Sequence, residues 1–503
     1  MFAILSHCIY NGRRKDFEKR VFMSNVRNLS MLSDFYEFTM ANAYFNHGMK
    51  DTIAVFDAFY RTNPDEGGYS IFAGLNDVID FIENLHFTEE DIAYLKEVGD
   101  FSDGFLDYLR DFKFTGDVWA FPEGSVMFPN EPIITVKAPI IECSIVETYL
   151  LLSMNFNSLI ATKTSRIVKA AGDRLVMEFG ARRAQGADAS LTGARAAFIA
   201  GAPVSSNTLS AKTYGFKPSG TMAHAWIQAF DSEYEAFKIY AENYPENCTL
   251  LIDTYDTINS GLPNAMRVFR EVLEPKGLTG GVRLDSGDLA YLSKEIRKIL
   301  DDNGFEDTKI VASNSLDEFK INSLTAQGAK IDAFGIGERL ITSKSDPVFG
   351  GVYKLVGIYE DDELKARIKV SENVEKITTP GFKNIYRLYD KNTGKAEADY
   401  ITLREEEVDD SKPLVIFDPL FTWKMKKMDN YEARLMQVPI FEGGKLVYDQ
   451  PDIHEIQAYC KKEIESIWDE VKRFDQPHNY YVDLSQDLWN LKQNLILEAK
   501  RGQ

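Results

Sequence analysis

This sequence has few cysteines and lacks long apolar runs. Its 503 residues include only four cysteines, Cys8, Cys143, Cys248 and Cys460, which are widely scattered and form neither a CxxC pair nor a cluster with histidine. A zinc site or a disulfide framework is therefore not expected, and a reducing compartment such as the cytoplasm fits. Because no run of about 18 apolar residues occurs, the sequence also predicts no membrane span.

Positive charge is scarce as well. Lysine and arginine number 57 against 77 aspartates and glutamates, which gives a formal net charge of −20. This balance disfavours general binding to nucleic acid or to an anionic membrane, since both need an excess of cations to meet phosphates. A phosphorylated small molecule can still bind in a local cationic pocket. Hydrophobic residues make up 44% of the chain, enough for sizeable cores, and the length suggests two to four domains.

The chain is expected to divide into four segments. Residues 1–22 mix both charges after a short apolar start, unlike a secretory signal, and are expected to be an extension or a disordered tail. Residues 23–165 combine helical and strand-like stretches, which predicts an N-terminal α+β domain. Residues 361–503 contain a predicted hairpin and two amphipathic helices. We expect them to form a C-terminal α+β extension that packs on the N-terminal domain or at a dimer interface.

Residues 166–360 alternate between strand-like and helix-like segments. This alternation predicts parallel strands with helical crossovers, either closed as an α/β barrel or left open. In both arrangements the functional residues lie at the C-terminal ends of the strands. The strand candidates are 174–179, 202–206, 248–253, 280–285, 308–313, 331–336 and 352–358.

Six of these candidate strands end in polar or glycine-containing turns. Each is by itself an ordinary turn or helix cap, but six such endings at one edge of a sheet predict a shared ligand site. Glycine lets backbone N–H groups approach an anion, so segments 313–315 and 335–339 suit a phosphate. Carboxylates suit ribose hydroxyls or hydrated Mg²⁺, and arginine pairs with carboxylate or phosphate. The candidates are Phe179 for stacking on a flat ring, Arg182 and Arg283 for an anion, and Asp253, Asp285 and Asp288 for hydroxyls or Mg²⁺.

The stretch 219–230 contains the only histidine between His86 and His454. His224 follows a small turn of Ser, Gly and Thr and precedes an apolar, helix-like run. Taken alone, this pattern favours a partly buried histidine at the start of a helix. Its position among the six polar strand endings is what makes it a candidate for chemistry.

Taken in order, the motifs resemble the nicotinate phosphoribosyltransferase family over roughly residues 25–495. The matching segments are 31–36 (MLSDFY), 178–183 (EFGARR), 220–224 (GTMAH), 253–257 (DTYDT), 281–289 (GVRLDSGDL), 334–337 (FGIG), 350–355 (GGVYKL) and 477–480 (PHNY). The resemblance implies an irregular α/β barrel of the type II phosphoribosyltransferase kind, with an N-terminal α+β domain and a C-terminal α+β extension. It also implies a cytoplasmic homodimer with shared active sites.

The activity implied by the resemblance is the first step of NAD salvage from nicotinate. Nicotinate and 5-phosphoribosyl 1-pyrophosphate would give nicotinate mononucleotide and pyrophosphate, with Mg²⁺ as cofactor. ATP would be a co-substrate whose hydrolysis is coupled to the reaction through a phosphohistidine.

The resemblance also assigns roles to individual residues. His224 matches the phosphorylated histidine, and Asp253 and Asp285 are expected to contact ribose hydroxyls and metal. The expected nicotinate-binding residues are Phe179, Arg182, Thr221, Arg283 and, from a neighbouring subunit, Tyr36. The expected contacts to the sugar diphosphate are Ser286, Gly287, Asp288, Ser313, Asn314, Gly335, Gly337 and Glu338, with Asp285 and Asp288 as candidate metal ligands. Glu338 departs from many relatives, which have Thr there, and an acid suits a phosphate site only if it points away or meets the metal.

Several alternatives remain open from the sequence. A nicotinamide- or quinolinate-using relative is the nearest, but segment 203–208 lacks the acid that nicotinamide-using enzymes carry in this region, which favours a carboxylate substrate. A phosphate-binding barrel lyase or nucleotide oxidoreductase would share the strand-end layout without the ordered motif set. A non-catalytic interaction protein on such a barrel would form no product from nicotinate and the sugar diphosphate.

Overall fold

The chain leaves one folded unit at residue 158 and returns to it at residue 348. The computed structural model describes residues 27–373 and 376–501, so the expected extension 1–22 lies outside the described residues. Residues 159–347 form one unit, here the barrel unit, and the described residues before and after them form the second, here the flanking unit. Among the described residues no helix is both long and apolar enough to cross a membrane.

A seven-stranded antiparallel sheet is the centre of the flanking unit. Its strand order is β14-β13-β1-β5-β3-β20-β21, so three strands from the N-terminal segment lie in the middle and strands from after residue 348 lie on both sides of them. The strands are β1 (Ile53–Tyr60), β3 (Asp117–Ala120), β5 (Ile134–Pro139), β13 (Gly351–Glu360), β14 (Glu363–Ala366), β20 (Val438–Glu442) and β21 (Lys445–Leu446). The N-terminal and C-terminal segments therefore share one sheet.

The placement of β13 corrects the sequence analysis. The run 352–358 was expected to be the last strand of the barrel, but β13 pairs with β1, with Ala58 opposite Tyr353. The barrel unit ends at residue 347 rather than at 360. A strand-like run fits an antiparallel or a parallel neighbour equally well, so its local sequence does not select its partner.

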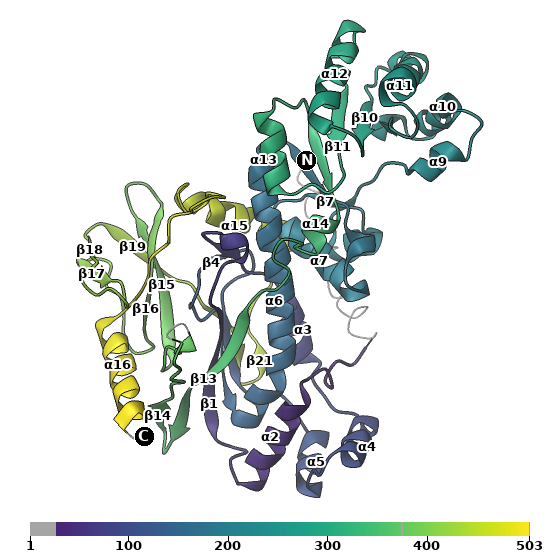
Figure 1. The fold of residues 1–503 in the computed structure, drawn as a ribbon. Coiled ribbons are helices and arrows are strands. Elements are labelled where there is room, and N and C mark those ends of the chain that lie inside the picture. Colours follow the sequence, from purple (N-terminus) through teal and green to yellow (C-terminus); the bar gives the residue numbers. More distant parts are fainter. Residues whose placement is uncertain (1–26, 374–375, 502–503) are drawn as a thin grey trace, which may run out of the picture. The chain divides into compact units, whose positions relative to one another are not determined.

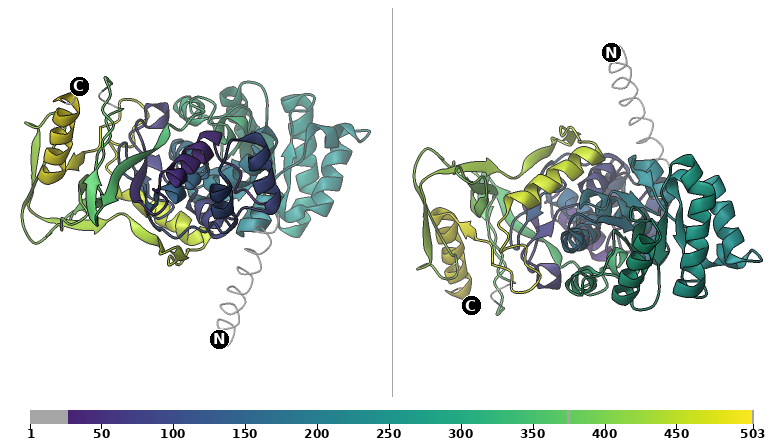
Figure 2. Two further views of the ribbon diagram at one scale, coloured as in Figure 1. Left: turned by 90° about the horizontal axis from the view of Figure 1, so that it is seen from below. Right: turned by 90° about the horizontal axis from the view of Figure 1, so that it is seen from above.

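Helices cover this sheet and a second, smaller one. The first part of α6 (Ile140–Ala171) lies beside β1, where the Cys143 thiol donates to the Ala54 carbonyl at 3.7 Å (Figure 1). The last helix, α16 (Gln486–Arg501), runs along β16 of a four-stranded sheet with the order β19-β15-β16-β22 (Figure 2). The remaining elements of the flanking unit are α2 (Phe35–Asn46), α3 (Leu75–Glu83), α4 (Glu89–Val98), α5 (Asp103–Arg110), β2 (Ser70–Ile71), β4 (Val126–Met127), β15 (Lys383–Asp390), β16 (Ala396–Leu403), β17 (Leu414–Phe417), β18 (Met425–Met428), β19 (Tyr431–Leu435), α15 (Ile453–Ser466) and β22 (Val482–Leu484).

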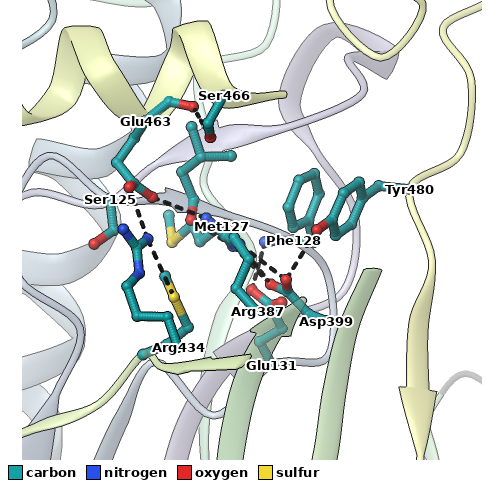
Figure 3. Close-up of polar contacts among 12 residues, drawn as sticks. Ser125, Met127, Phe128, Glu131, Arg387, Asp399, Arg434, Glu463, Ser466 and Tyr480 are labelled. Atoms are coloured by element: carbon teal, nitrogen blue, oxygen red, sulfur yellow. Dashed lines mark hydrogen bonds and ion pairs between the residues drawn. The ribbon is translucent and has the colours of Figure 1, made fainter. Parts of the chain in front are cut away.

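A buried ionic network connects distant parts of the flanking unit (Figure 3). Arg387 on β15 donates to Asp399 from Nε at 2.8 Å and from Nη2 at 2.6 Å, and to Glu463 from Nη1 at 3.0 Å. Its Nη2 also donates to the Val126 carbonyl at 3.0 Å, and Tyr480 donates to Asp399 at 3.0 Å. Every nitrogen of the guanidinium is thus paired inside the fold.

Glu131 is a buried carboxyl group beside Asp399 in this network. Burial raises its pKa well above the usual value, and the neighbouring Asp399 charge raises it further. Burial would also raise the pKa of Asp399, but the attraction of Arg387 and several hydrogen bonds outweigh it and lower that pKa. The charge of Asp399 therefore favours the protonated form of Glu131.

A seven-stranded parallel sheet is the centre of the barrel unit. Its order is β8-β7-β6-β12-β11-β10-β9, and every pairing in it is parallel. The strands are β6 (Leu175–Glu178), β7 (Val204–Ser205), β8 (Lys217–Pro218), β9 (Thr249–Leu251), β10 (Gly281–Leu284), β11 (Lys309–Ala312) and β12 (Ala333–Ile336). Read as a circle, this order follows the chain from β6 to β12 and back to β6, with one break between β8 and β9. The α/β prediction is confirmed, in the form of a curled half-barrel.

Helices connect the strands as the alternating pattern predicted. They are α7 (Ala187–Ile199), α8 (Thr208–Tyr214), α9 (His224–Gln228), α10 (Glu233–Asn243), α11 (Leu262–Val268), α12 (Leu289–Asp302), α13 (Glu318–Ala326) and α14 (Glu338–Ile341). In Figure 1, α12 and α13 lie beside β10 and β11. The stretch 219–230 falls in the connection between β8 and β9, which is the one break in the circle of strands.

Candidate active site

His224 is the first residue of α9 and is linked to two strand ends. Its Nδ1 lies 3.0 Å from the hydroxyl of Thr254, which follows β9. Its Nε2 lies 4.0 Å from Oδ2 of Asp285, which follows β10. The imidazole is about half exposed, so one ring nitrogen is held by the fold while the other faces a carboxylate and solvent.

Arg283 on β10 is the hub of the site. Its Nε donates to the Ser313 hydroxyl at 2.9 Å, Nη1 to the Thr221 hydroxyl at 2.8 Å, and Nη2 to Asp285 Oδ1 at 3.2 Å. These bonds bring together the ends of β10 and β11 and the segment that precedes α9. Guanidinium groups hold fixed positions when several donors are engaged at once, so Arg283 is preorganised.

An apolar surface lies on the same face of the sheet as Arg283. In the strand register Arg283 is beside Val311, and Val311 is beside Ala333. Side chains in register on adjacent parallel strands share a face, so Arg283 is next to the buried cluster of Met177, Val311 and Ala333, against which Phe179 packs. The Arg283 guanidinium carbon is 6.0 Å from the centre of the Phe179 ring. A flat, negatively charged ring would find both an aromatic surface and a cation here.

Gly335 and Gly337 make room for Phe179. A Cβ atom on Gly335 would come within 2.7 Å of the Phe179 ring, and one on Gly337 would come within 3.0 Å of the Phe179 carbonyl oxygen. Both glycines were expected to contact the sugar diphosphate. In the structure they allow the backbone at the end of β12 to pass close to Phe179, and their contact with the sugar diphosphate stays a prediction.

The carboxylate of Asp253, after β9, is bound to the turn that follows β10. Oδ2 of Asp253 accepts from the Asp285 backbone N–H at 2.9 Å and from the Ser286 hydroxyl at 2.6 Å. Oδ1 of Asp253 is buried and has no hydrogen-bond partner among the described residues. Such an unsatisfied oxygen is costly unless a ligand or ion completes it.

The fit to Mg²⁺ rests on these two carboxylates. Within the described part of the chain there is no group of three or more His, Cys, Asp or Glu residues placed to hold a metal ion. Mg²⁺ commonly keeps several waters and binds one or two carboxylates together with substrate phosphates. The free Oδ1 of Asp253 and the Oδ2 of Asp285 fit that mode. Asp288 fits less well, because it caps α12 by accepting from the Tyr291 N–H at 3.0 Å.

Ser313 is engaged within the site. It is buried, and its hydroxyl accepts from Arg283 and donates to Asp285 Oδ1. These bonds assign the hydroxyl to the positioning of Arg283, and its contact with a phosphate stays a prediction. The next residues are exposed and turn the backbone sharply, with φ of 88° at Asn314 and 52° at Ser315. Positive φ is uncommon for residues other than glycine and is often found at ligand sites, so the Asn314 prediction keeps its structural support.

Glu338 begins α14 and forms an ion pair with Lys344 at 2.6 Å. The hydrogen bond from Lys344, followed by its charge and those of Arg183 and Arg339, lowers the pKa of Glu338. The acid is therefore ionised and already compensated by a cation. A direct contact of Glu338 with a phosphate is not supported by this pairing.

The remaining predicted residues are at the edge of the site or outside it. Arg182 is exposed on the short turn after β6 and makes no hydrogen bond or ion pair with the described residues. Gly287 has a φ of 78° between β10 and α12, a conformation that glycine readily adopts. Tyr36 is about half exposed on α2 in the flanking unit. Burial, and then the charges of Glu147 and Glu37, raise its pKa. Its reach to a neighbouring subunit stays a prediction.

Thr254 and Glu178 are residues whose roles the sequence analysis missed. Thr254 holds His224, and its only signal was its place directly after Asp253. Glu178 ends β6, is buried, and accepts from the Ser205 hydroxyl and the Gly180 N–H. Burial raises the pKa of Glu178. It fixes the ends of β6 and β7 and the turn that carries Phe179.

Comparison with known proteins identifies this arrangement. Three family models for nicotinate phosphoribosyltransferase match the chain, the N-terminal domain at residues 31–155, the family domain at 175–365 and the C-terminal domain at 382–492. The nicotinate phosphoribosyltransferase of Bacillus subtilis (strain 168) is 45% identical over 473 residues, which cover 94% of this chain and 96% of the relative. That of Homo sapiens is 30% identical over 527 residues, covering 92% and 96%. The crystal structure of human nicotinic acid phosphoribosyltransferase matches with a TM-score of 0.80 at 28% identity, covering 92% of this chain and 99% of that one. The chain therefore belongs to the nicotinate phosphoribosyltransferase family.

Proposed function

We propose that this enzyme joins nicotinate to the ribosyl group of 5-phosphoribosyl 1-pyrophosphate, giving nicotinate mononucleotide and pyrophosphate in NAD salvage. The observation that carries the proposal is the position of Arg283, which lies beside the aromatic ring of Phe179 and the carboxylate of Asp285 at the strand ends. The coupling of ATP hydrolysis through His224 is part of the same proposal.

Nicotinate fits this position because it is both flat and anionic. Its ring would lie against Phe179, and its carboxylate would meet Arg283 and Thr221. Arg283 has five N–H groups, of which three make the bonds described above. One N–H remains on Nη2, and the second on Nη1 makes only a long bond of 3.5 Å to the Met222 carbonyl. Two adjacent donors are therefore available to a carboxylate in a bidentate arrangement.

The lack of acidic residues in the segment that contains β7 also favours a carboxylate substrate. The segment 203–208 contains no acid. The nearest carboxyl group at this strand end, that of Glu178, is buried and engaged by Ser205 and Gly180. No exposed carboxylate at this strand end would therefore repel nicotinate.

The transfer itself requires little proton movement. The pyridine nitrogen of nicotinate carries no proton, so its lone pair can form the bond to the anomeric carbon as the bond to pyrophosphate breaks. The carbon gains positive charge on the way, and the leaving group gains negative charge. Asp253 and Asp285 would hold the ribose hydroxyls, and the turns at 286–288 and 314–315 would hold the phosphates. Positioning and charge stabilisation supply most of the rate increase in such a reaction.

Mg²⁺, bound by Asp253 and Asp285 together with the diphosphate, would neutralise the charge of the leaving group. His224 would accept the terminal phosphoryl group of ATP on Nε2, because Nδ1 is held by Thr254. The phosphorus–oxygen bond to ADP breaks as the phosphorus–nitrogen bond forms, and water later releases phosphate. The phosphohistidine adds roughly −1.5 to −2 charge beside Asp285, which would strengthen binding of a metal–diphosphate pair.

An assay of pyrophosphate release tests the activity and its alternatives. Purified protein is given nicotinate, nicotinamide or quinolinate with the sugar diphosphate, with and without ATP. Of the three pyridines, we expect only nicotinate to give product, and we expect ATP to stimulate the release of pyrophosphate. Turnover of another pyridine in preference to nicotinate, or absence of any product, would contradict the proposal.

The His224→Asn variant tests the coupling. We expect it to lose ATP stimulation while it retains a basal release of pyrophosphate. If ATP coupling and the affinity for the sugar diphosphate both survive in this variant, His224 is not the phosphoryl carrier. A Gln228→Ala variant, at the other end of α9, serves as the matched control and should keep the coupling.

A homodimer with shared sites is the remaining part of the proposal. Tyr36→Ala and Arg283→Ala are each expected to be inactive, because each removes a nicotinate contact. If Tyr36 reaches the neighbouring subunit, mixed dimers contain one intact site, and mixing equal amounts should restore about a quarter of the wild-type activity. No recovery after subunit exchange, in a sample that sedimentation shows to be dimeric, would place Tyr36 in its own subunit's site.

A further inference from the structure

The flanking unit contains a cavity that the proposed reaction does not use. Its volume is about 720 Å³, and it lies among β13, β14, the turn before β15, the end of β16, and α16. Three cations, Lys365, Arg367 and Arg404, and the apolar side chains of Tyr359, Phe382 and Leu491 are among its lining residues. None of the residues assigned to nicotinate or to the sugar diphosphate belongs to this lining.

Arg404 is held in the cavity wall without a counter-ion. Its guanidinium carbon is 4.8 Å from the ring centres of both Trp119 and Phe382, so aromatic rings fix its plane. Nη1 donates to the Asn384 side-chain oxygen at 2.6 Å. No carboxylate of the described residues forms an ion pair with Arg404, and its other N–H groups have no partner there. Burial lowers its pKa, which is the cost of a partly desolvated cation that an anion would relieve.

Lys365 and Arg367 can also turn toward a ligand. Lys365 forms an ion pair with Glu363, and Arg367 forms one with Glu360. Both pairs are at least partly exposed to solvent. Exposed ion pairs contribute little to stability, so exchanging them for a better-placed anion costs little. The lining contains these three cations and one acid, Glu405, in a chain whose net charge is −20. The cavity is therefore a local exception to the acidic character of the protein.

We propose that this cavity binds a small organic anion in which a phosphate or carboxylate is joined to a planar ring, up to the size of a mononucleotide. The cations pair with the anionic group, and Tyr359, Phe382 and the leucines of α16 contact the ring. The volume falls within the roughly 300–1,000 Å³ that is usual for small-molecule sites. Both halves of the ligand are needed, because the lining combines cations with aromatic and aliphatic side chains.

Calorimetric titration with AMP tests this site, with adenosine and inorganic phosphate as the two halves of the probe. We expect AMP to bind the full-length protein, and each half to bind at least about tenfold more weakly. Arg404→Gln should weaken AMP binding at least about tenfold, the effect of losing one charge-assisted bond. The same variant should leave kcat/KM for nicotinate unchanged. Because Arg404 also packs between two rings, the double variant Lys365→Gln/Arg367→Gln, at exposed positions, provides a second test of the same expectation.

Arg283→Ala separates this cavity from the candidate active site. It should abolish turnover while AMP affinity for the cavity is retained. AMP binding that persists unchanged in both cavity variants, or that disappears in Arg283→Ala alone, assigns the nucleotide to the barrel unit and overturns the proposal. Absence of AMP binding to the wild-type protein overturns it as well.

Discussion

Each unit of the protein contains an arginine on a strand that forms an ion pair with an aspartate, Arg387 with Asp399 in the flanking unit and Arg283 with Asp285 in the barrel unit. The side chains of Arg387 and Asp399 are 0% exposed, whereas those of Arg283 and Asp285 are 16% and 34% exposed. Arg387 meets two carboxylates and a backbone carbonyl, as Figure 3 shows. Arg283 meets one carboxylate and two hydroxyls and keeps unused N–H groups.

The difference separates a structural cluster from a ligand site. A buried charge must be paired within the fold, because its desolvation is otherwise not compensated. The guanidinium of Arg387 meets this requirement through Asp399, Glu463 and the Val126 carbonyl. The Arg283 cluster does not meet it, since Asp253 has a buried oxygen without a partner among the described residues. An incomplete set of polar groups in a preorganised place is what a substrate can complete.

The largest effect is expected from removing the buried cation. Arg387→Met leaves Asp399 buried without its cation and Glu463 with Arg434 alone, so we expect the free energy of unfolding to fall by about 3–5 kcal/mol. Urea unfolding measures this loss. The control Lys427→Met breaks the exposed pair with Asp429, which is 2.6 Å long, and should change stability by less than about 0.5 kcal/mol. Equal effects of the two variants would show that burial does not distinguish these ion pairs.

The second effect is on activity rather than stability. Asp285→Asn removes a charge that faces Arg283, His224 and the reacting sugar, so kcat/KM should fall about a hundredfold or more. The free energy of unfolding should change by less than about 1 kcal/mol, because the side chain is partly exposed. Asp301→Asn, which breaks the Arg297 pair on α12, is the matched control and should keep full activity. A variant that unfolds readily instead would make the Arg283 cluster structural, like that of Arg387.

A smaller effect is expected from Ser313, whose hydroxyl joins Arg283 to Asp285. Ser313→Ala should raise the KM for nicotinate about tenfold, since a hydrogen bond to a charged group contributes roughly 1.5 kcal/mol. The KM for the sugar diphosphate should change little, because Ser313 positions Arg283 rather than holding phosphate. Ser313→Thr keeps the hydroxyl and should recover part of the loss. A rise confined to the KM of the sugar diphosphate would restore the phosphate role instead.

The smallest effect is a dependence of stability on pH. The pKa of Glu131 is raised in the folded state, so its proton stabilises the fold fully below the usual value of 4.5. That contribution is lost as the pH rises toward the folded-state pKa. Glu131→Gln keeps a neutral side chain at every pH, so its stability relative to wild type should increase from pH 4.5 upward. Each pH unit above 4.5 should add at most about 1.4 kcal/mol to this difference until the folded-state pKa is reached. Urea unfolding across this range measures the difference, and a constant difference would show that Glu131 is ionised in the fold.

Much of the barrel unit followed from the sequence because its signals are local. The alternation of apolar strands with helices predicted the parallel sheet, and the turns after β6, β9, β10, β11 and β12 placed Phe179, Asp253, Asp285, Asn314 and Gly337 at one edge. Parallel strands have their C-terminal ends at the same edge of the sheet, so residues that follow successive strands in the sequence come together in one site. His224 needed the order of the motifs as well, since the histidine by itself only suggested the start of a helix.

Tertiary structure decided the strand pairings and side-chain contacts that join residues far apart in the chain. The strand 351–360 joined β1 instead of the barrel, because a strand's local sequence does not name its neighbour. The hydroxyl of Ser313 accepts from Arg283, which is 30 residues away in the sequence. Arg387 donates to Glu463, which is 76 residues away in the sequence, and to the Val126 carbonyl, which is 261 residues away. The sequence by itself therefore determined the elements, their order and the chemistry at the strand ends, because those depend on neighbouring residues. Only packing determined which polar groups are satisfied within the fold and which remain available to a ligand.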